Sequence, residues 1–220
     1  MTAANYDACI SKVLQYEGGY TQDPNDKGNW TGCSVGVGTN KGTNRGISAC
    51  SYPKEDIKGM TEARAKEIYR ADYWKKVCGD DLPAGPDLCT FDGGVNSGPS
   101  RGVKWLQKAV GAAEDGVVGP QTIAAANAAD DHVTIDRACN YRLDFLRGLS
   151  TWPTYGKGWS SRVEDVRVTA HGMVVAVPED ELPPWEPTPG PPPPWEPRPA
   201  EFVTITLRLT LPKGSKIEIV

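Results

Sequence analysis

A proline-rich stretch divides the chain and limits the length that can fold as one body. Residues 178–200 contain the near-repeats P-P-W-E-P-T-P and P-P-W-E-P-R-P, centred on Trp185 and Trp195. Proline fixes φ and has no backbone N–H, so this composition favours an extended, semi-rigid polyproline spacer. The part before it, residues 1–177, is long enough to bury a hydrophobic core without disulfides or a metal.

The residues after this spacer have a different pattern. F-V-T-I-T-L-R-L-T alternates apolar and polar side chains, L-P-K-G is typical of a turn, and S-K-I-E-I-V alternates again. This predicts a two-stranded β-hairpin tail over residues 201–220. Because an isolated hairpin is marginally stable in water, we expect the tail to dock on this chain, on another protein or on a second copy.

The body before the spacer has the hydrophobic periodicity of helices. The first helix carries Ile10 and Val13 on one face, Thr61 is placed to cap the second, and Gly111 ends the helix that opens at Ser100. A loop rich in Gly, Asn and Asp fills residues 21–48, with a short hairpin expected around S-V-G-V-G. The fold class is therefore mainly α, and Trp74, Trp105 and Trp159 are expected in the core. Helices are predicted over residues 6–16, 61–74, 100–110, 121–128, 131–149 and 159–168. In the helix over 131–149, Arg142 lies on the apolar, inward side with Ile135, Cys139 and Leu146.

Charge and cysteine content exclude several classes of function. The formal net charge is −4 and the pI about 5.3, which does not fit a nucleic-acid-binding surface. No apolar run approaches the roughly 20 residues of a membrane span, and the N-terminus has no signal-peptide pattern. We therefore expect synthesis in the cytoplasm. The six cysteines form no C-x-x-C pair and have no histidine at ligand spacing, so no metal site is expected.

In the cytoplasm these cysteines are expected to be reduced, structural thiols. If the protein is exported, Cys33 with Cys50, and Cys78 with Cys89, are the first pairs to test for disulfides. No organic cofactor is implied by any motif.

Two carboxylates near the N-terminus suggest acid–base chemistry. Continuing the stripe of Ile10 and Val13 leads to Glu17, which precedes Gly18 and Gly19 in E-G-G-Y. An apolar helix face and the negative end of the helix dipole would favour a protonated carboxylic acid there, and a glycine can end the helix in the left-handed conformation. Asp26, in a polar loop, should stay ionised, and a protonated acid with an ionised partner is what glycoside hydrolysis requires. Asp23 in the same loop is an alternative to Asp26.

Further segments carry a family resemblance. They are E-G-G-Y at 17–20, D-P-N-D-K-G at 23–28, G-V-G-T-N-K-G-T-N-R-G-I-S at 36–48, Y-R-A-D-Y-W at 69–74, F-D-G-G-V-N-S-G at 91–98 and Y-G-K-G-W-S-S-R-V at 155–163. In this order they resemble glycoside hydrolase family 108, which comprises phage and bacterial N-acetylmuramidases. L-Q-K-A-V-G-A-A-E-D-G-V-V-G-P-Q-T at 106–122 resembles the predicted peptidoglycan-binding half that accompanies this catalytic half. The resemblance covers residues 4–168.

The resemblance implies a lysozyme-like helical fold, with a small loop or β-hairpin region by the active site. Its catalytic half would span residues 1–90, and a helical peptidoglycan-binding half, residues 91–177, would pack on it. Glu17 would be the catalytic acid and Asp26 would orient or activate water. A threonine hydroxyl would assist, either Thr43 in T-N-R-G-I-S or, because an insertion precedes that motif, Thr31.

Four other residues are candidates for substrate binding. Tyr20 and Trp30 flank the expected cleft and would stack on sugar rings, or would simply cover the loop. Asp92 and Asn96 lie one helical turn apart and would hydrogen-bond the substrate, although Asp92 would serve equally as a helix cap.

The sequence thus predicts a muramidase that cleaves the β-1,4 bond between N-acetylmuramic acid and N-acetylglucosamine in bacterial peptidoglycan. The alternatives are a lytic transglycosylase, which uses one glutamate and no water-positioning carboxylate, and a non-catalytic wall-binding or virion structural protein. Without a signal peptide, the route to the periplasmic wall would be a phage holin, a virion or a secretion system, and a phage endolysin fits best.

Overall fold

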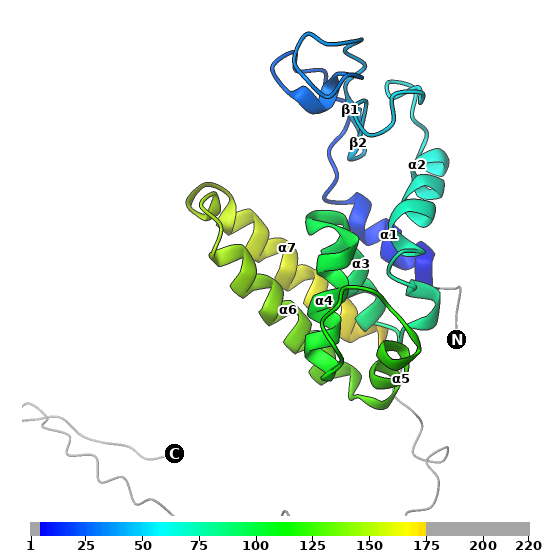
Figure 1. The fold of residues 1–220 in the computed structure, drawn as a ribbon, viewed down its shortest axis with the longest axis vertical. Helices are drawn as coiled ribbons and strands as arrows, with labels where there is room; N and C mark the ends of the chain where they lie inside the picture. The colour runs from blue at the N-terminus through cyan, green and yellow to red at the C-terminus, as the bar shows by residue number, and fades with distance from the viewer. Residues whose placement is uncertain (1–4, 175–220) are drawn as a thin grey trace, which may run out of the picture. The chain divides into compact units, whose positions relative to one another are not determined.

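The computed structural model describes residues 5–174 of the chain (Figure 1). The proline-rich linker and the β-hairpin tail predicted for residues 178–220 lie outside the described residues. Within them the fold is mainly α, which confirms the predicted class, and no helix is long and apolar enough to cross a membrane. The helices are α1 (Asn5–Leu14), α2 (Glu62–Tyr69), α3 (Pro86–Ser97), α4 (Pro99–Val110), α5 (Pro120–Ala128), α6 (Asp131–Arg147) and α7 (Trp152–Met173).

Three short helical turns and one small sheet complete the fold. The turns are η1 (Lys27–Asn29), η2 (Arg70–Trp74), which is a π-helix continuing α2, and η3 (Gly79–Asp81). Strands β1 (Thr43–Asn44) and β2 (Ile47–Ser48) pair antiparallel, with Thr43 opposite Ser48 and Asn44 opposite Ile47. Residues 21–60, which include both strands, form a lobe that the segment after α1 connects to the helices (Figure 1).

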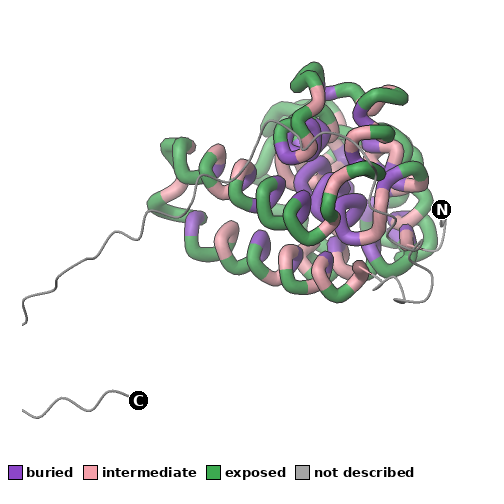
Figure 2. The backbone as a smooth tube through the Cα atoms, turned by 90° about the horizontal axis from the view of Figure 1, so that it is seen from below, coloured by how far each residue is buried: buried purple, intermediate pink, exposed green. Residues whose placement is uncertain are grey.

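Helix α3 lies at the centre of the helical body. Its residues from Pro86 to Gly94 are all buried, and it contacts α1, α4, α6 and α7 (Figure 2). A helix buried on every side needs small residues where another backbone comes close. A Cβ atom on Gly102 of α4 would lie 2.5 Å from the carbonyl oxygen of Thr90 and 2.7 Å from the amide nitrogen of Gly94. Glycine at this crossing therefore permits the close packing of α3 against α4.

Aromatic packing joins α3 to α1 and η2. The Trp74 ring meets Tyr6 and Phe91 edge-on, with centroids 5.3 and 5.2 Å apart. Trp74 is fully buried and Trp105 is 8% exposed, so the prediction that these two tryptophans lie in the core is confirmed. Trp159 is only half-buried. Thr61 caps α2 by accepting from the Arg64 amide, as predicted.

The predicted end of the first helix is wrong. Helix α1 stops at Leu14, and the chain tightens into i→i+3 bonds from Gln15 to Lys12 and from Tyr16 to Val13. Glu17 thus follows the helix instead of extending its apolar face. Neither Gly18 nor Gly19 has a positive φ, so neither is a left-handed cap.

The last helix is longer than predicted, beginning at Trp152 and not at Trp159. The sequence misses this start because residues 152–158 contain three poor helix formers, Pro153, Gly156 and Gly158. Pro153, however, lies in the first turn, where a missing backbone N–H costs nothing. Helix α3 likewise begins with Pro86 at its N-terminus.

The predicted hairpin around residues 34–38 is also wrong, because that stretch forms turns and the strands lie at 43–44 and 47–48. Arg45 and Gly46 connect the strands with φ values of 50° and 74°. Positive φ at both residues is the requirement of a type I′ turn, which suits the twist of a two-residue hairpin.

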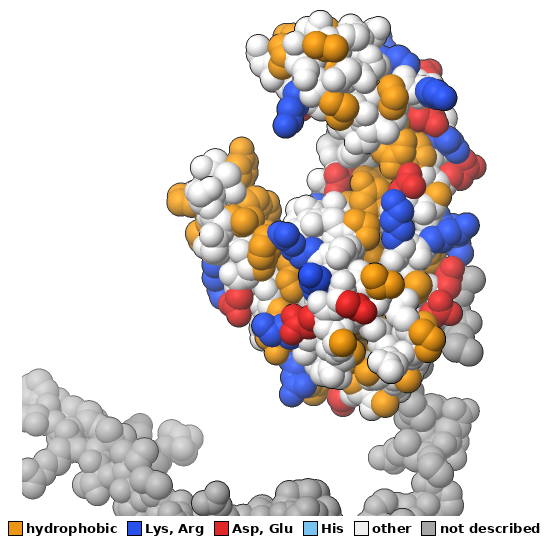
Figure 3. Space-filling view, viewed as in Figure 1, with side chains coloured by type: hydrophobic (Ala, Val, Ile, Leu, Met, Phe, Trp, Pro, Cys, Tyr) orange, Lys and Arg blue, Asp and Glu red, His pale blue; other side chains and the backbone are white. Residues whose placement is uncertain are grey.

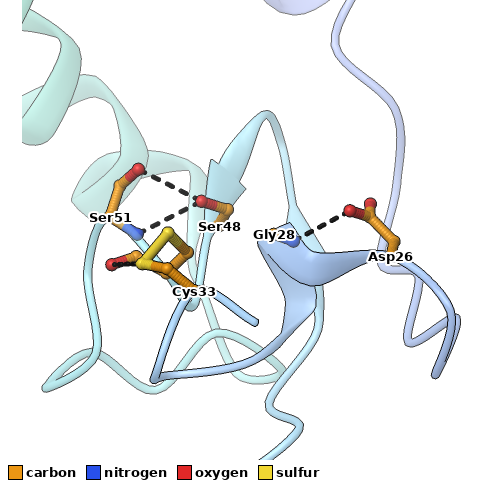
Figure 4. Close-up of a disulfide and its surroundings, with 6 residues drawn as sticks. Asp26, Gly28, Cys33, Ser48 and Ser51 are labelled. Atoms are coloured by element: carbon orange, nitrogen blue, oxygen red, sulfur yellow. Dashed lines mark hydrogen bonds between the residues drawn. A yellow bond between two sulfur atoms is a disulfide. The ribbon is translucent and has the colours of Figure 1, made fainter. Parts of the chain in front are cut away.

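Cys33 and Cys50 form a disulfide beside the Ser48–Ser51 hydrogen bonds (Figure 4). The expectation of reduced thiols is therefore wrong for this pair. The disulfide ties the insertion, which lies between Gly28 and Thr43, to the segment after β2. Cys78 and Cys89 are not joined. Cys9, Cys89 and Cys139 are buried free thiols, with the Cys89 and Cys139 sulfur atoms 3.7 Å apart.

Four thiols should titrate in the unfolded, unreduced protein and six after reduction. Cys33→Ser should lower the free energy of unfolding by up to about 3 kcal/mol, because the disulfide restricts the unfolded chain. Cys78→Ser is the matched control, since Cys78 is a free thiol with a similar left-handed φ of 51° against 57° at Cys33. Six reactive thiols before reduction would contradict the disulfide.

Asp87 predicts a pH dependence of stability. Its buried carboxylate accepts from Asn5 Nδ2 at 2.9 Å, from the Gly85 amide at 2.9 Å and from the Leu88 amide at 2.6 Å. Burial outweighs these bonds and raises the pKa of Asp87 from 3.8 to about 6. Between these values the folded state holds a proton that the unfolded state releases, so stability falls as pH rises from about 4 to about 6.

Chemical denaturation across this range should therefore show the wild type losing about 3 kcal/mol of unfolding free energy relative to Asp87→Asn. Identical pH dependence of the two proteins would contradict the raised pKa of Asp87.

Candidate active site

Glu17 lies where the chain leaves α1 for the lobe of residues 21–60 (Figure 1). Its side chain is 18% exposed. Next to it, Gly18 and Gly19 have no atom within 4 Å of where a Cβ atom would stand, so the chain here borders open space. Figure 3 shows a hollow between this lobe and the connected ends of α6 and α7. Glu17 thus combines a held carboxylate with access from outside.

A buried chain of charges holds Glu17 from the helical side. Arg162 of α7 places both terminal nitrogens 3.3 Å from Glu17 Oε1, and its Nη2 lies 2.7 Å from Asp92 Oδ1. Asp92 of α3 is fully buried and also accepts from Arg142 of α6, at 2.6 Å. Two carboxylates and two guanidinium groups therefore alternate and balance in charge, as buried ions must.

The charges in this chain reinforce one another. Burial alone would raise the pKa of Asp92, but Arg142 and Arg162 together lower it below its ordinary value. Burial would likewise lower the pKa of Arg162, and Asp92 and then Glu17 more than offset that effect. The Arg162 guanidinium also packs 4.9 Å from the centroid of the Tyr16 ring. Arg162 is thus fixed on several sides before it reaches Glu17.

The β1–β2 turn holds Glu17 from the lobe. A Cβ atom on Gly46 would lie 2.5 Å from Glu17 Oε2 and 2.4 Å from the Tyr69 hydroxyl oxygen. Tyr69 donates to the Arg45 carbonyl at 2.9 Å, and the Arg45 amide donates to the Gly18 carbonyl at 2.9 Å. Gly46 therefore serves two needs, a left-handed turn and room for the carboxylate.

Tyrosines from α2 and η2 line the same side. Burial first, and the negative charge of Glu17 second, raise the pKa of Tyr69 far above its ordinary value. Burial, Asp72 and Glu17 raise the pKa of Tyr73 in the same way. Both phenols stay neutral at physiological pH, so Tyr69 remains a hydrogen-bond donor at the site.

Asp26 lies on the exposed loop and shapes it locally. Its Oδ1 accepts from the Gly28 amide at 2.8 Å and so caps η1 (Figure 4). Asp23 makes a comparable turn, accepting from the Asn25 amide at 2.9 Å. Among the described residues no hydrogen bond joins either aspartate to Glu17, so the catalytic role of Asp26 stays a prediction.

The two candidate threonines have different surroundings. Thr43 begins β1, two residues before the Arg45–Gly46 turn that lies against Glu17. Its hydroxyl donates to Asn29 Oδ1 at 2.7 Å. Thr31 lies in the insertion, where its hydroxyl accepts from the Thr39 amide at 2.9 Å. Fully buried Asn29 also donates to the Asp23 carbonyl at 3.0 Å, so it links Thr43 to the aspartate-rich loop. This arrangement favours Thr43 over Thr31.

Trp30 lies on the lobe of residues 21–60, and Tyr20 directly precedes that lobe. Tyr20 is 36% exposed and lines a separate pocket of about 400 Å³ with Lys41, Glu55 and Lys58, among others. Glu17 does not line this pocket. Trp30 is half-buried and donates to the Pro24 carbonyl at 2.9 Å, which braces the loop. Tyr20 is thus the more available of the two to a ligand.

The structure corrects the role expected for Asp92. The residue has no exposed surface and all its carboxylate contacts go to Arg142 and Arg162, so it can neither bind a sugar nor cap a helix. Asn96, one turn further along α3, is half-buried and accepts from the Ser97 hydroxyl. Its role in substrate binding stays a prediction.

Sequence reasoning missed three residues around Glu17: Arg162, which bonds its carboxylate, and Gly46 and Tyr69, which lie beside it. One signal was available, because Arg142 was expected on the inward side of its helix, and a buried arginine requires an anionic partner. Asp92 is that partner. Within residues 5–174 no group of three or more His, Cys, Asp and Glu side chains is arranged to hold a metal ion.

Comparisons with known proteins identify the family. The model of the glycosyl hydrolase 108 family matches residues 10–98, and that of a predicted peptidoglycan domain matches residues 101–164. The two matches meet at the junction of α3 and α4. The division into halves at residues 90 and 91 stays a prediction. No functionally curated protein matches the chain.

A solved structure, that of SagA from Brucella abortus, is 39% identical in sequence. The match covers 78% of this chain and 97% of SagA, with a TM-score of 0.65. Family model and solved structure together confirm the resemblance drawn from the motifs. The chain belongs to the glycosyl hydrolase 108 family, and it is a glycoside hydrolase with a predicted peptidoglycan domain at residues 101–164.

Proposed function

We propose that this protein is an N-acetylmuramidase that hydrolyses the β-1,4 bond between N-acetylmuramic acid and N-acetylglucosamine, with Glu17 as the catalytic acid. The observation that carries the proposal is the position of Glu17. Its carboxylate is bonded by Arg162 and lies against the β1–β2 turn, and the chain next to it borders open space at Gly18 and Gly19. Precise positioning of a reacting group is a large part of enzymatic rate enhancement.

The proposed reaction transfers one proton from Glu17 to the glycosidic oxygen as the bond to the anomeric carbon breaks. Asp92 lies nearer to Arg162 than Glu17 does, at 2.7 Å against 3.3 Å. The shorter contact of Arg162 therefore goes to Asp92, and Glu17 takes the longer one.

Water then completes the hydrolysis. Asp26, with the Thr43 hydroxyl, would orient a water molecule, accept its proton as the oxygen bonds to the anomeric carbon, and finally return a proton to Glu17. The Thr43–Asn29 bond supports this assignment, because it fixes the threonine beside the aspartate-rich loop.

The proposed place of action is the bacterial cell wall. The Cys33–Cys50 disulfide supports an oxidising compartment outside the cytoplasm. Delivery as a phage endolysin through a holin remains our prediction for the route.

Glu17→Gln should lower kcat on purified peptidoglycan by about 10²- to 10⁴-fold, because the amide cannot donate the proton. Binding to peptidoglycan and thermal stability should change little, since the amide keeps the shape of the side chain. Turnover by Glu17→Gln at the wild-type rate would contradict the catalytic role. Asp26→Asn and Asp23→Asn form a matched pair in one loop, and only the first should impair turnover.

Product analysis by mass spectrometry separates hydrolysis from the transglycosylase alternative. Hydrolysis yields new reducing ends, whereas a lytic transglycosylase yields 1,6-anhydro ends. Anhydro products without new reducing ends would refute the muramidase proposal.

Gly46→Ala should lower kcat/KM by about 100-fold, because the methyl group displaces the Glu17 carboxylate. Gly36→Ala is the matched control: Gly36 has a similar φ, 79° against 74°, but no atom within 4 Å of the new methyl group. The control variant has the same backbone strain but does not displace the Glu17 carboxylate, so it should keep wild-type activity. Equal activity losses in the two variants would show that strain alone is responsible.

A further inference from the structure

The first two turns of α7 carry three aromatic side chains on one face. Trp152, Tyr155 and Trp159 follow one another at spacings of three and four residues, which places them in a row along a helix. The Trp159 ring centroid lies 6.3 Å from that of Trp152 and 5.6 Å from that of Tyr155. We call these three residues the aromatic row.

The row is both exposed and firmly seated. Tyr155 is 55% exposed, while Trp152 and Trp159 are half-buried against the core. A Cβ atom on Gly156 would lie 2.6 Å from the Trp152 ring, so glycine lets this ring lie against the helix. Aromatic side chains held in this way offer a large contact surface at little cost in conformational entropy. Isolated exposed apolar residues are common, but three adjacent rings are not.

The aromatic row leads to the catalytic glutamate. Arg162, which contacts Glu17, lies three residues after Trp159 and therefore on the same face of α7. Tyr155 and Arg162 are seven residues apart, which is about 10 Å along a helix axis. Figure 3 shows hydrophobic side chains over the connected ends of α6 and α7, beside the hollow. The row thus extends the active site along α7.

The chemistry of the row fits a sugar chain. The C–H groups on one face of a pyranose ring pack well on the electron-rich face of an aromatic ring, and the rims of tyrosine and tryptophan hydrogen-bond to polar groups. Residues 145–163 contain no acidic side chain. N-acetylated sugars, some bearing a lactyl carboxylate, would meet no repulsion here.

We propose that Trp152, Tyr155 and Trp159 form a stacking platform that binds the glycan strand of peptidoglycan on one side of the bond to be cleaved. The proposal rests on the proposed function for the identity of the glycan. It gives Trp159, expected in the core from sequence, a binding role through its exposed part.

Binding is tested in full-length Glu17→Gln protein, so that turnover does not interfere. The probes are purified peptidoglycan and a hexamer of β-1,4-linked N-acetylglucosamine, and affinity is measured from tryptophan fluorescence and sedimentation with the insoluble wall. Adding Tyr155→Ala should weaken binding by about five- to tenfold, whereas Tyr155→Trp should preserve it. Val168→Ala, at a 63% exposed apolar position on the same helix, is the control and should leave affinity unchanged.

Unchanged affinity in Tyr155→Ala for both probes would overturn the platform. So would a dimer that Tyr155→Ala dissociates, or protection of the row by the residues after Val174, because the surface would then serve self-association or the tail. Hydrolysis by wild type is measured separately. If wild type hydrolyses peptidoglycan but Tyr155→Ala binds normally, the platform is refuted and the proposed function stands. If Tyr155→Ala weakens binding but wild type does not hydrolyse peptidoglycan, the proposed function is refuted and the platform stands.

Discussion

The site depends on one buried ionic interaction, that of Asp92 with Arg142 and Arg162. A carboxylate with no exposed surface needs cationic partners, and these come from α6 and α7. Removing one partner of such a pair typically costs about 3–5 kcal/mol, because an uncompensated charge stays buried. Arg162 reaches beyond Asp92 to Glu17. The interaction that joins three helices therefore also fixes the proposed catalytic group.

A second constraint comes from the lobe. The Arg45–Gly46 turn touches Glu17, and the lobe around it is tied together by the Thr43–Asn29 bond and the Cys33–Cys50 disulfide. Glu17 is thus held between two units built in different ways, a charge-paired helical core and a small cross-linked loop region. The chain next to Glu17 borders open space at Gly18 and Gly19, and the aromatic row lies on α7, the helix that carries Arg162.

The sequence predicted the mainly α class, the cap at Thr61, the family and the inward position of Arg142, because hydrophobic periodicity and local motifs carry that information. It wrongly continued the first helix toward Glu17, because tertiary contacts decide whether the chain after Leu14 stays α-helical or tightens into i→i+3 turns. It also wrongly predicted the hairpin at 34–38, because tertiary contacts decide which of two glycine-containing segments, 34–38 or 43–48, forms the strands. The sequence suggests Asp92 as a substrate contact because its partners in the fold, Arg142 and Arg162, lie 50 and 70 residues away along the chain. Pairing over such distances leaves no local pattern, and so Arg162 was missed.

A double-mutant cycle between Asp92 and Arg162 tests the central claim most directly. Asp92→Asn, Arg162→Gln and the double variant are compared by kcat/KM on peptidoglycan, after circular dichroism has shown that each is folded. If the two residues act as one unit that positions Glu17, the double variant should be no less active than the more impaired single variant. Losses that multiply in the double variant would show that the two residues act independently, and would contradict this account.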